Sequence, residues 1–145
     1  MTPENQQKLA LYLASTRHKT HKWGEWDCML FGVDWVDILL DTNHAESIRG
    51  QYDSQKTAVK FARKYLKAPA WLDARGFKDI TEVKDEKESA IQQGDIWLQD
   101  MGVYHVAWIM FGGIAHGVNE QNGLVRVVPD AFKKQTRWRF NVDEK

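Results

Sequence analysis

An apolar run from Cys28 to Leu40 constrains the fold of this chain more than any other stretch. A helix over these residues is hydrophobic nearly all round, and in a globular protein such a helix lies buried at the centre. Asp27 stands where an N-cap residue is expected. Asp34, Asp37 and Asp41 share one face of the helix and could do acid-base work, but a solvated stripe is the simpler interpretation. We therefore predict a central buried helix that begins near Asp27.

Cys28, the only cysteine of the chain, falls in the first turn of that helix. The unpaired N–H groups and the positive dipole end of a helix stabilise anions, so a thiol there tends to be acidic and nucleophilic. A buried cysteine that only fills space is the alternative, since most free cysteines are of that kind. The position alone leaves both interpretations open.

The order of the predicted elements indicates an α+β protein. Thr2-Pro3, Ser54 and Pro69 each mark the start of a helix in the first half of the chain, and the charged run 84–88 reads as an exposed loop. Short apolar runs rich in β-branched and aromatic residues follow, at 96–98, 103–110, 114–118, 124–128 and 138–140. We predict a single domain over 1–145, with a helical part at about 1–76 and an antiparallel sheet at about 94–141.

Composition excludes several classes of function. The chain has 20 basic and 20 acidic residues, so no net charge attracts it to nucleic acid. One cysteine forms no internal disulfide, and no stretch approaches the roughly 20 apolar residues of a membrane span. The polar N-terminus lacks the apolar core of a signal peptide, which predicts synthesis and folding in the cytosol.

A thiol nucleophile needs a base, and His105 is the candidate. It lies near the start of a predicted strand and shares a face with Ala107 and Ile109, a face that could pack against the helix bearing Cys28. His18 and His21 are three apart, but no clustered ligands complete a metal site near them, so we predict no metal or other cofactor.

These residues together resemble the NlpC-type cysteine peptidases, which have a papain-like fold and cleave the peptide stems of the bacterial cell wall. The resemblance rests on Trp23-Gly24, Asp27-Cys28, Gly94-Asp95-Ile96-Trp97, His105-Val106-Ala107-Trp108-Ile109 and Ile114-Ala115-His116. Arg49-Gly50-Gln51-Tyr52 and Trp138-Arg139 make it most similar to the short versions encoded among phage tail genes.

The resemblance implies a role for each matching residue. Cys28 would be the nucleophile, His105 the general base and His116 the residue that orients it. Asp27 would hold the free amino end of the stem peptide, and Trp23 and His21 would complete the substrate site. The family has serine where this chain has Met29, and tyrosine where it has His21.

The third catalytic residue depends on the register of one hairpin. If Gly112-Gly113 forms a two-residue turn, His116 lies opposite Ile109, about 13 Å along the strand from His105 at 3.3 Å per residue, and Glu120 lies opposite His105. A bulge or a longer loop would instead bring His116 back to His105. Glu120 is therefore the alternative to His116, and the resemblance favours His116.

The function expected from the resemblance is a thiol endopeptidase that hydrolyses peptidoglycan stem peptides. Its partners would be bacterial peptidoglycan and phage tail proteins, and its location the virion. A tail-assembly protein that keeps the fold without activity is the alternative, favoured by Met29 and His21. An amidase or acyltransferase on the same fold is a further one.

Overall fold

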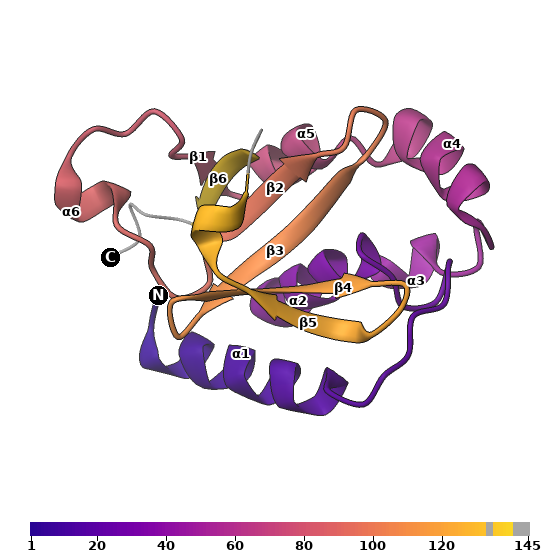
Figure 1. Ribbon diagram of the computed structural model, residues 1–145, viewed down its shortest axis with the longest axis horizontal. Coiled ribbons are helices and arrows are strands. Elements are labelled where there is room, and N and C mark those ends of the chain that lie inside the picture. The colour runs from indigo at the N-terminus through magenta and orange to yellow at the C-terminus, as the bar shows by residue number, and fades with distance from the viewer. Residues whose placement is uncertain (133–134, 141–145) are drawn as a thin grey trace.

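The computed structural model describes residues 1–132 and 135–140. The helices precede most of the strands along the chain, which confirms the α+β prediction (Figure 1). The α-helices are α1 (Pro3–Thr16), α2 (Leu30–Leu40), α3 (Ala45–Ile48), α4 (Gln55–Tyr65), α5 (Ala68–Ala74) and α6 (Glu86–Ser89). The strands are β1 (Phe77–Asp79), β2 (Ile96–Asp100), β3 (His105–Phe111), β4 (Ile114–Asn119), β5 (Gly123–Val127) and β6 (Gln135–Phe140), with a 3-10 turn, η1, at Pro129–Ala131.

The strands form one antiparallel sheet in the order β1-β6-β2-β3-β4-β5. Strands β2 to β5 follow one another as a meander, whereas β6 inserts between β1 and β2. The five apolar runs predicted as strands correspond to β2 through β6. The predicted end of the sheet at residue 141 lies outside the described residues.

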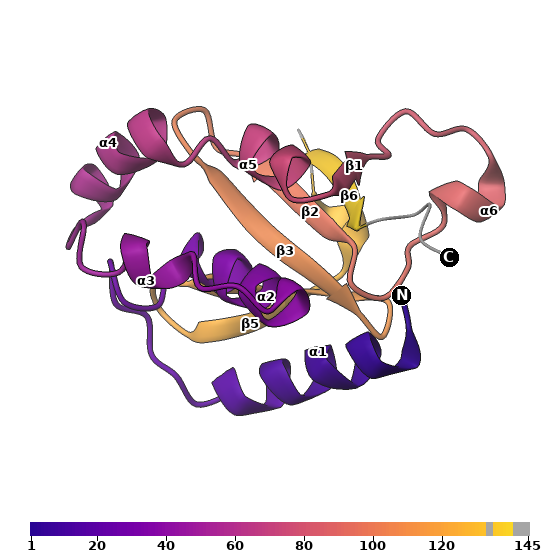
Figure 2. The same ribbon diagram turned by 180° about the vertical axis from the view of Figure 1, so that it is seen from behind.

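Helices α1 and α2 lie on the same side of the sheet (Figures 1 and 2). Phe31, Trp35 and Val36 of α2 are fully buried there, together with Ile109 of β3. Helix α2 lies close to β3 at Gly32, where an added Cβ atom would be only 2.9 Å from the Cβ atom of Ala107. The absence of a side chain at Gly32 permits this close packing. The prediction of a central buried helix is confirmed.

Local signals explain where the long helices begin. The Thr2 hydroxyl accepts the N–H of Asn5, and proline occupies the first turn of α1. Ser54 and Thr57 form a reciprocal capping box at the start of α4. Both start signals were visible in the sequence.

Two short α-helices and one short strand were missed by the sequence analysis. Helix α6 overlaps the predicted loop at 84–88 and ends one residue beyond it, and α3 and β1 were not expected. Each has only three or four residues, too few for hydrophobic periodicity to mark it. They depend on tertiary contacts, such as the pairing of β1 with β6.

A buried ion pair joins β6 to the residue that precedes β2. Arg139 binds Asp95 through two hydrogen bonds of 2.8 Å, from Nε to Oδ1 and from Nη2 to Oδ2. Its remaining donors bind the carbonyl oxygens of Glu88 and Ala90. The side chains are 11% and 2% exposed, so a carboxylate left alone here would be buried without its counter-charge.

We expect Arg139→Ala to lower the free energy of unfolding by about 3–5 kcal/mol, because it leaves the Asp95 carboxylate buried and unpaired. Urea unfolding followed by circular dichroism measures this loss. Lys22→Ala is the matched control, since the Lys22–Glu25 pair is more than 60% exposed at both side chains and should contribute less than about 1 kcal/mol. Equal losses in the two variants would contradict a structural role of the buried pair.

Candidate functional site

Cys28 lies in the turn that leads into α2, and Asp27 organises this turn. The Oδ1 atom of Asp27 accepts the N–H groups of Met29 and Leu30 at 2.9 Å, as a capping carboxylate does. Helix α2 begins at Leu30, and the carbonyl of Asp27 accepts the N–H of Phe31, four residues later, as in a helical turn. The predicted capping role of Asp27 is therefore confirmed.

The other oxygen of Asp27 holds two more segments together. Its Oδ2 atom accepts the N–H of Gly24 at 2.9 Å and the hydroxyl of Tyr52 at 2.8 Å. Gly24 has φ of +84°, and a Cβ atom there would lie 1.9 Å from the carbonyl oxygen of Tyr52, so only glycine fits. Asp27 thus ties the Trp23-Gly24 turn to the segment after α3.

Asp27 has no exposed surface, and four donors of its own chain occupy its oxygens. A contact with the amino end of a substrate would require one of these hydrogen bonds to break. The substrate-binding role implied by the resemblance stays a prediction, and the geometry favours the structural role.

We expect Asp27→Asn to lower the free energy of unfolding by about 2–4 kcal/mol, because an amide has one acceptor oxygen where four donors converge. Tyr52→Phe, which removes one of these bonds, should cost about 2 kcal/mol. Asp73→Asn, at an exposed position, is the control for a change of charge and should stay within about 0.5 kcal/mol of wild type. Urea unfolding of the four proteins gives the comparison, and an unchanged Asp27→Asn protein would refute the structural role.

The Cys28 thiol is 5% exposed, and its surroundings disfavour the thiolate. Burial and the carboxylate of Asp27 raise the pKa of Cys28 from 9.0 to about 12, with a further increase from Glu120. Its own backbone N–H lowers the pKa, but by less than burial and Asp27 raise it. The expectation of an acidic thiol is wrong, because burial disfavours the charged form and the carboxylate that caps the helix repels a second negative charge.

We expect iodoacetamide to alkylate folded protein at neutral pH at least about tenfold more slowly than urea-unfolded protein, since only the thiolate reacts. Glu120→Gln removes one of the charges that raise the pKa, so its alkylation midpoint should move to lower pH. Glu25→Gln, at a side chain 62% exposed, is the matched control. A wild-type midpoint near neutral pH would contradict the environment described above.

The raised pKa of Cys28 also predicts how stability depends on pH. The folded value of about 12 lies above the unfolded value of 9.0, so this thiol contributes stability that is complete below pH 9.0 and is lost as the pH rises toward 12. The difference in unfolding free energy between wild type and Cys28→Ala should therefore shrink over this interval. A difference that stays constant would exclude a raised thiol pKa.

His105 begins β3 and is half-buried. It lines a small pocket of about 40 Å³ together with Met29, Gly32 and Ala107. The side chain therefore faces the first turns of α2, on the face of β3 that the alternation of residues predicted. Leu66 and Trp71 close the same pocket on the side of α4 and α5.

The β3–β4 hairpin has the register of a two-residue turn, with Phe111 opposite Ile114 and Ile109 opposite His116. His116 is consequently four residues along the ladder from the level of His105, about 13 Å away. Its ring packs on Phe111, and Nδ1 lies 3.1 Å from the carbonyl oxygen of Ile114. Burial lowers the pKa of His116. The prediction that His116 orients His105 is wrong, because the register separates them.

Glu120, the alternative third residue, lies in the turn between β4 and β5 near Cys28. Its Oε2 atom accepts a hydrogen bond of 3.4 Å from Nε1 of Trp23, and the ring of Trp23 contacts that of His21 edge-on, with centroids 4.6 Å apart. These three predicted residues therefore meet on one side of the thiol. Whether Glu120 also orients His105 stays a prediction.

Tyr104 belongs to the same surroundings and was missed by the sequence analysis. Burial raises its pKa, with further increases from the negative charges of Cys28 and Glu120, which places all three within electrostatic reach. Its position directly before His105 was the available signal.

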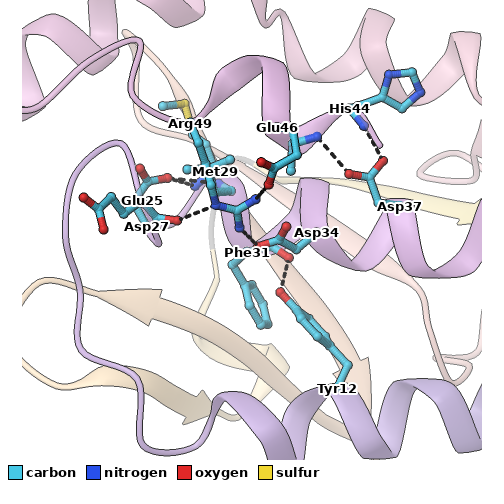
Figure 3. A network of polar contacts seen from close by, with 12 residues as sticks. Tyr12, Glu25, Asp27, Met29, Phe31, Asp34, Asp37, His44, Glu46 and Arg49 are labelled. Atoms are coloured by element: carbon cyan, nitrogen blue, oxygen red, sulfur yellow. Dashed lines mark hydrogen bonds and ion pairs between the residues drawn. The ribbon is translucent and has the colours of Figure 1, made fainter. Parts of the chain in front are cut away.

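Of the three aspartates predicted as a solvated stripe, Asp34 and Asp37 bind neighbouring groups (Figure 3), whereas Asp41 is exposed at the C-terminal end of α2. Asp34 binds Arg49, whose Nε atom also donates to the carbonyl of Glu25. Asp37 accepts the N–H groups of His44 and Ala45 at the start of α3. Asp34 and Asp37 therefore fix the segment that carries Tyr52 and do not form an acid-base pair.

Within residues 1–132 and 135–140, no group of three or more histidine, cysteine, aspartate or glutamate side chains could hold a metal ion. None of the described helices combines the length and hydrophobicity needed to cross a membrane.

The chain belongs to the DUF6950 family, a domain of unknown function, which matches residues 1–139. No curated protein and no solved structure matches the chain. The match includes Asp27, Cys28, His105 and Glu120, so the candidate site lies within the family domain.

Proposed function

We propose that this protein is a thiol hydrolase with a papain-like arrangement that cleaves amide bonds of peptidoglycan stem peptides as part of a phage tail. The observation that carries the proposal is the close packing of α2 on the face of β3 that bears His105. Gly32, one helical turn after Cys28, contacts Ala107, two residues after His105 on the same face. The helix that follows the Cys28 turn and the strand that starts at His105 are thereby packed together.

The raised pKa of Cys28 determines the order of the proton transfers. The thiol is protonated at neutral pH, so His105 accepts its proton as the sulfur attacks the substrate carbonyl carbon. The N–H groups of Met29 and Leu30 are bound to Asp27, which assigns the oxyanion to the backbone N–H of Cys28. His105 then protonates the leaving amine, and water hydrolyses the acyl-enzyme with His105 again as the base.

Glu120 is proposed as the residue that orients His105, in place of His116. It is a carboxylate within electrostatic reach of the thiol, and it accepts a hydrogen bond from Trp23. The substrate class and the association with tails rest on the resemblance of the sequence motifs.

Release of stem-peptide fragments from purified peptidoglycan tests the proposal. We expect activity in wild type, none in Cys28→Ala, and a decrease of about 10²–10⁴-fold in His105→Gln. Glu120→Gln should decrease activity less than His105→Gln, whereas His116→Gln and the exposed control His18→Gln should remain active. Equal release by wild type and Cys28→Ala would refute the role of the thiol.

A binding or tail-assembly protein without activity is the second candidate function. The closed environment of the thiol favours it, because two carboxylates and burial act against the thiolate. Wild-type protein that releases no fragments and no free amine from peptidoglycan, yet remains bound to purified tail particles, would support this candidate. An amidase or acyltransferase would instead be identified by the bond formed or broken in the products.

A further inference from the structure

Helices α3, α4 and α5 follow one another around one end of the molecule (Figure 2). A hollow of about 390 Å³ is lined by residues of these helices and of the segments beside them, and Cys28 is not among the residues that line it. Aromatic and apolar side chains form its walls, and a cation and several neutral polar groups line it. Among the lining residues are Ile48, Phe61, Tyr65, Leu66, Trp71 and Arg75. Its volume falls in the range of sites for small organic ligands.

Arg75 is held in this hollow by a stacking contact. Its guanidinium carbon lies 3.9 Å from the centroid of the Trp71 ring, and Nη1 donates to the carbonyl of Trp71 at 3.0 Å. The edge of the Trp71 ring system is further fixed by His44, whose ring meets it at 82°. A stacked guanidinium keeps its N–H donors in its own plane, pointing away from the ring face.

The charge of Arg75 is not paired within the described part of the chain. None of the described carboxylates forms an ion pair with it, and its buried Nε atom has no hydrogen-bond partner. Asp37 acts on it through space, but the oxygens of Asp37 accept donors from Thr42, His44 and Ala45. Nη1 is engaged by the carbonyl of Trp71, whereas Nε and Nη2 have no hydrogen-bond partner among the described residues. Two neighbouring donors of this lining residue are therefore unused.

We propose that this hollow binds the carboxylate of a short peptide, with Arg75 as the ion-pair partner and Trp71 as the floor beneath it. A planar fork of N–H donors matches a carboxylate bidentately. A neutral sugar would leave the cation unpaired, and the apolar walls formed by Ile48, Phe61 and Leu66 suit the side chain of an amino acid.

The hollow shares a wall with the pocket of His105. Trp71 and Leu66 line both, so a ligand held by Arg75 lies one side chain away from the pocket of the proposed base. In this respect the inference rests on the proposed function, and it assigns the hollow as the subsite for a carboxylate of the stem peptide.

Binding can be measured without catalysis in Cys28→Ala protein. The probes are N-acetyl-alanyl-alanine, its C-terminal amide and inorganic phosphate, and the readout is the ¹H–¹⁵N signals of Arg75 Nε and Trp71 Nε1. We expect the acid to shift both signals and to bind at least about tenfold more tightly than the amide, because only the acid forms the charge-assisted pair.

The Arg75→Gln variant should lose at least about tenfold in affinity for the acid. Arg17 is exposed at the C-cap of α1, and the control variant Arg17→Gln should bind the acid as the parent does. Equal binding of acid and amide by the parent protein, which needs no variant at Arg75, overturns the proposal. So does the absence of shifts up to the solubility limit of the peptide. Phosphate that binds more tightly than the acid overturns the assignment to a carboxylate.

The binding and hydrolysis experiments fail independently. Binding of the acid without release of stem-peptide fragments by wild type would refute the hydrolase and leave the carboxylate site in place. Release without binding in the hollow would refute the carboxylate site and leave the hydrolase in place.

Discussion

The buried carboxylate of Asp27 is the interaction on which the candidate site depends. It caps the turn that carries Cys28, holds Gly24 in a left-handed conformation and binds the hydroxyl of Tyr52. A carboxylate without exposed surface is stable only when donors satisfy its oxygens, and here they come from three separate segments. The same charge disfavours the thiolate next to it. The carboxylate that stabilises the turn therefore also lowers the reactivity of the thiol that the turn carries.

The effect of Asp27 on the thiol has a chemical consequence for the proposed hydrolase. A preformed thiolate is not available at neutral pH, so proton transfer to His105 has to accompany attack rather than precede it. The two carboxylates near the thiol differ in this respect. Asp27 is fixed in the interior by four donors, whereas Glu120 is exposed and accepts a hydrogen bond from Trp23.

The sequence predicted the parts of the fold that local chemistry determines. The caps at Thr2 and Ser54 and the buried helix follow from propensities and spacing alone. The sequence also marked the hairpin at Gly112-Gly113, but it left the register open between a two-residue turn and a bulge or longer loop. The hollow at Arg75 could not be predicted, because stacking on Trp71 and the convergence of α3, α4 and α5 are tertiary. His116 illustrates the limit of motif resemblance, since the two-residue turn that the sequence allowed is the one observed, and it separates His116 from His105.

The place of β6 in the sheet affects how the chain folds during synthesis. Because β6 lies between β1 and β2, neither of these strands has its neighbour on that side until the ribosome has made residues 135–140. The meander of β2 to β5 can pair earlier, since each strand follows its partner closely in sequence. Arg139 then closes the sheet by reaching Asp95, 44 residues earlier in the chain. Until that step the unpaired edge of β2 is open to strands of other molecules, which makes a chaperone useful at this stage of folding.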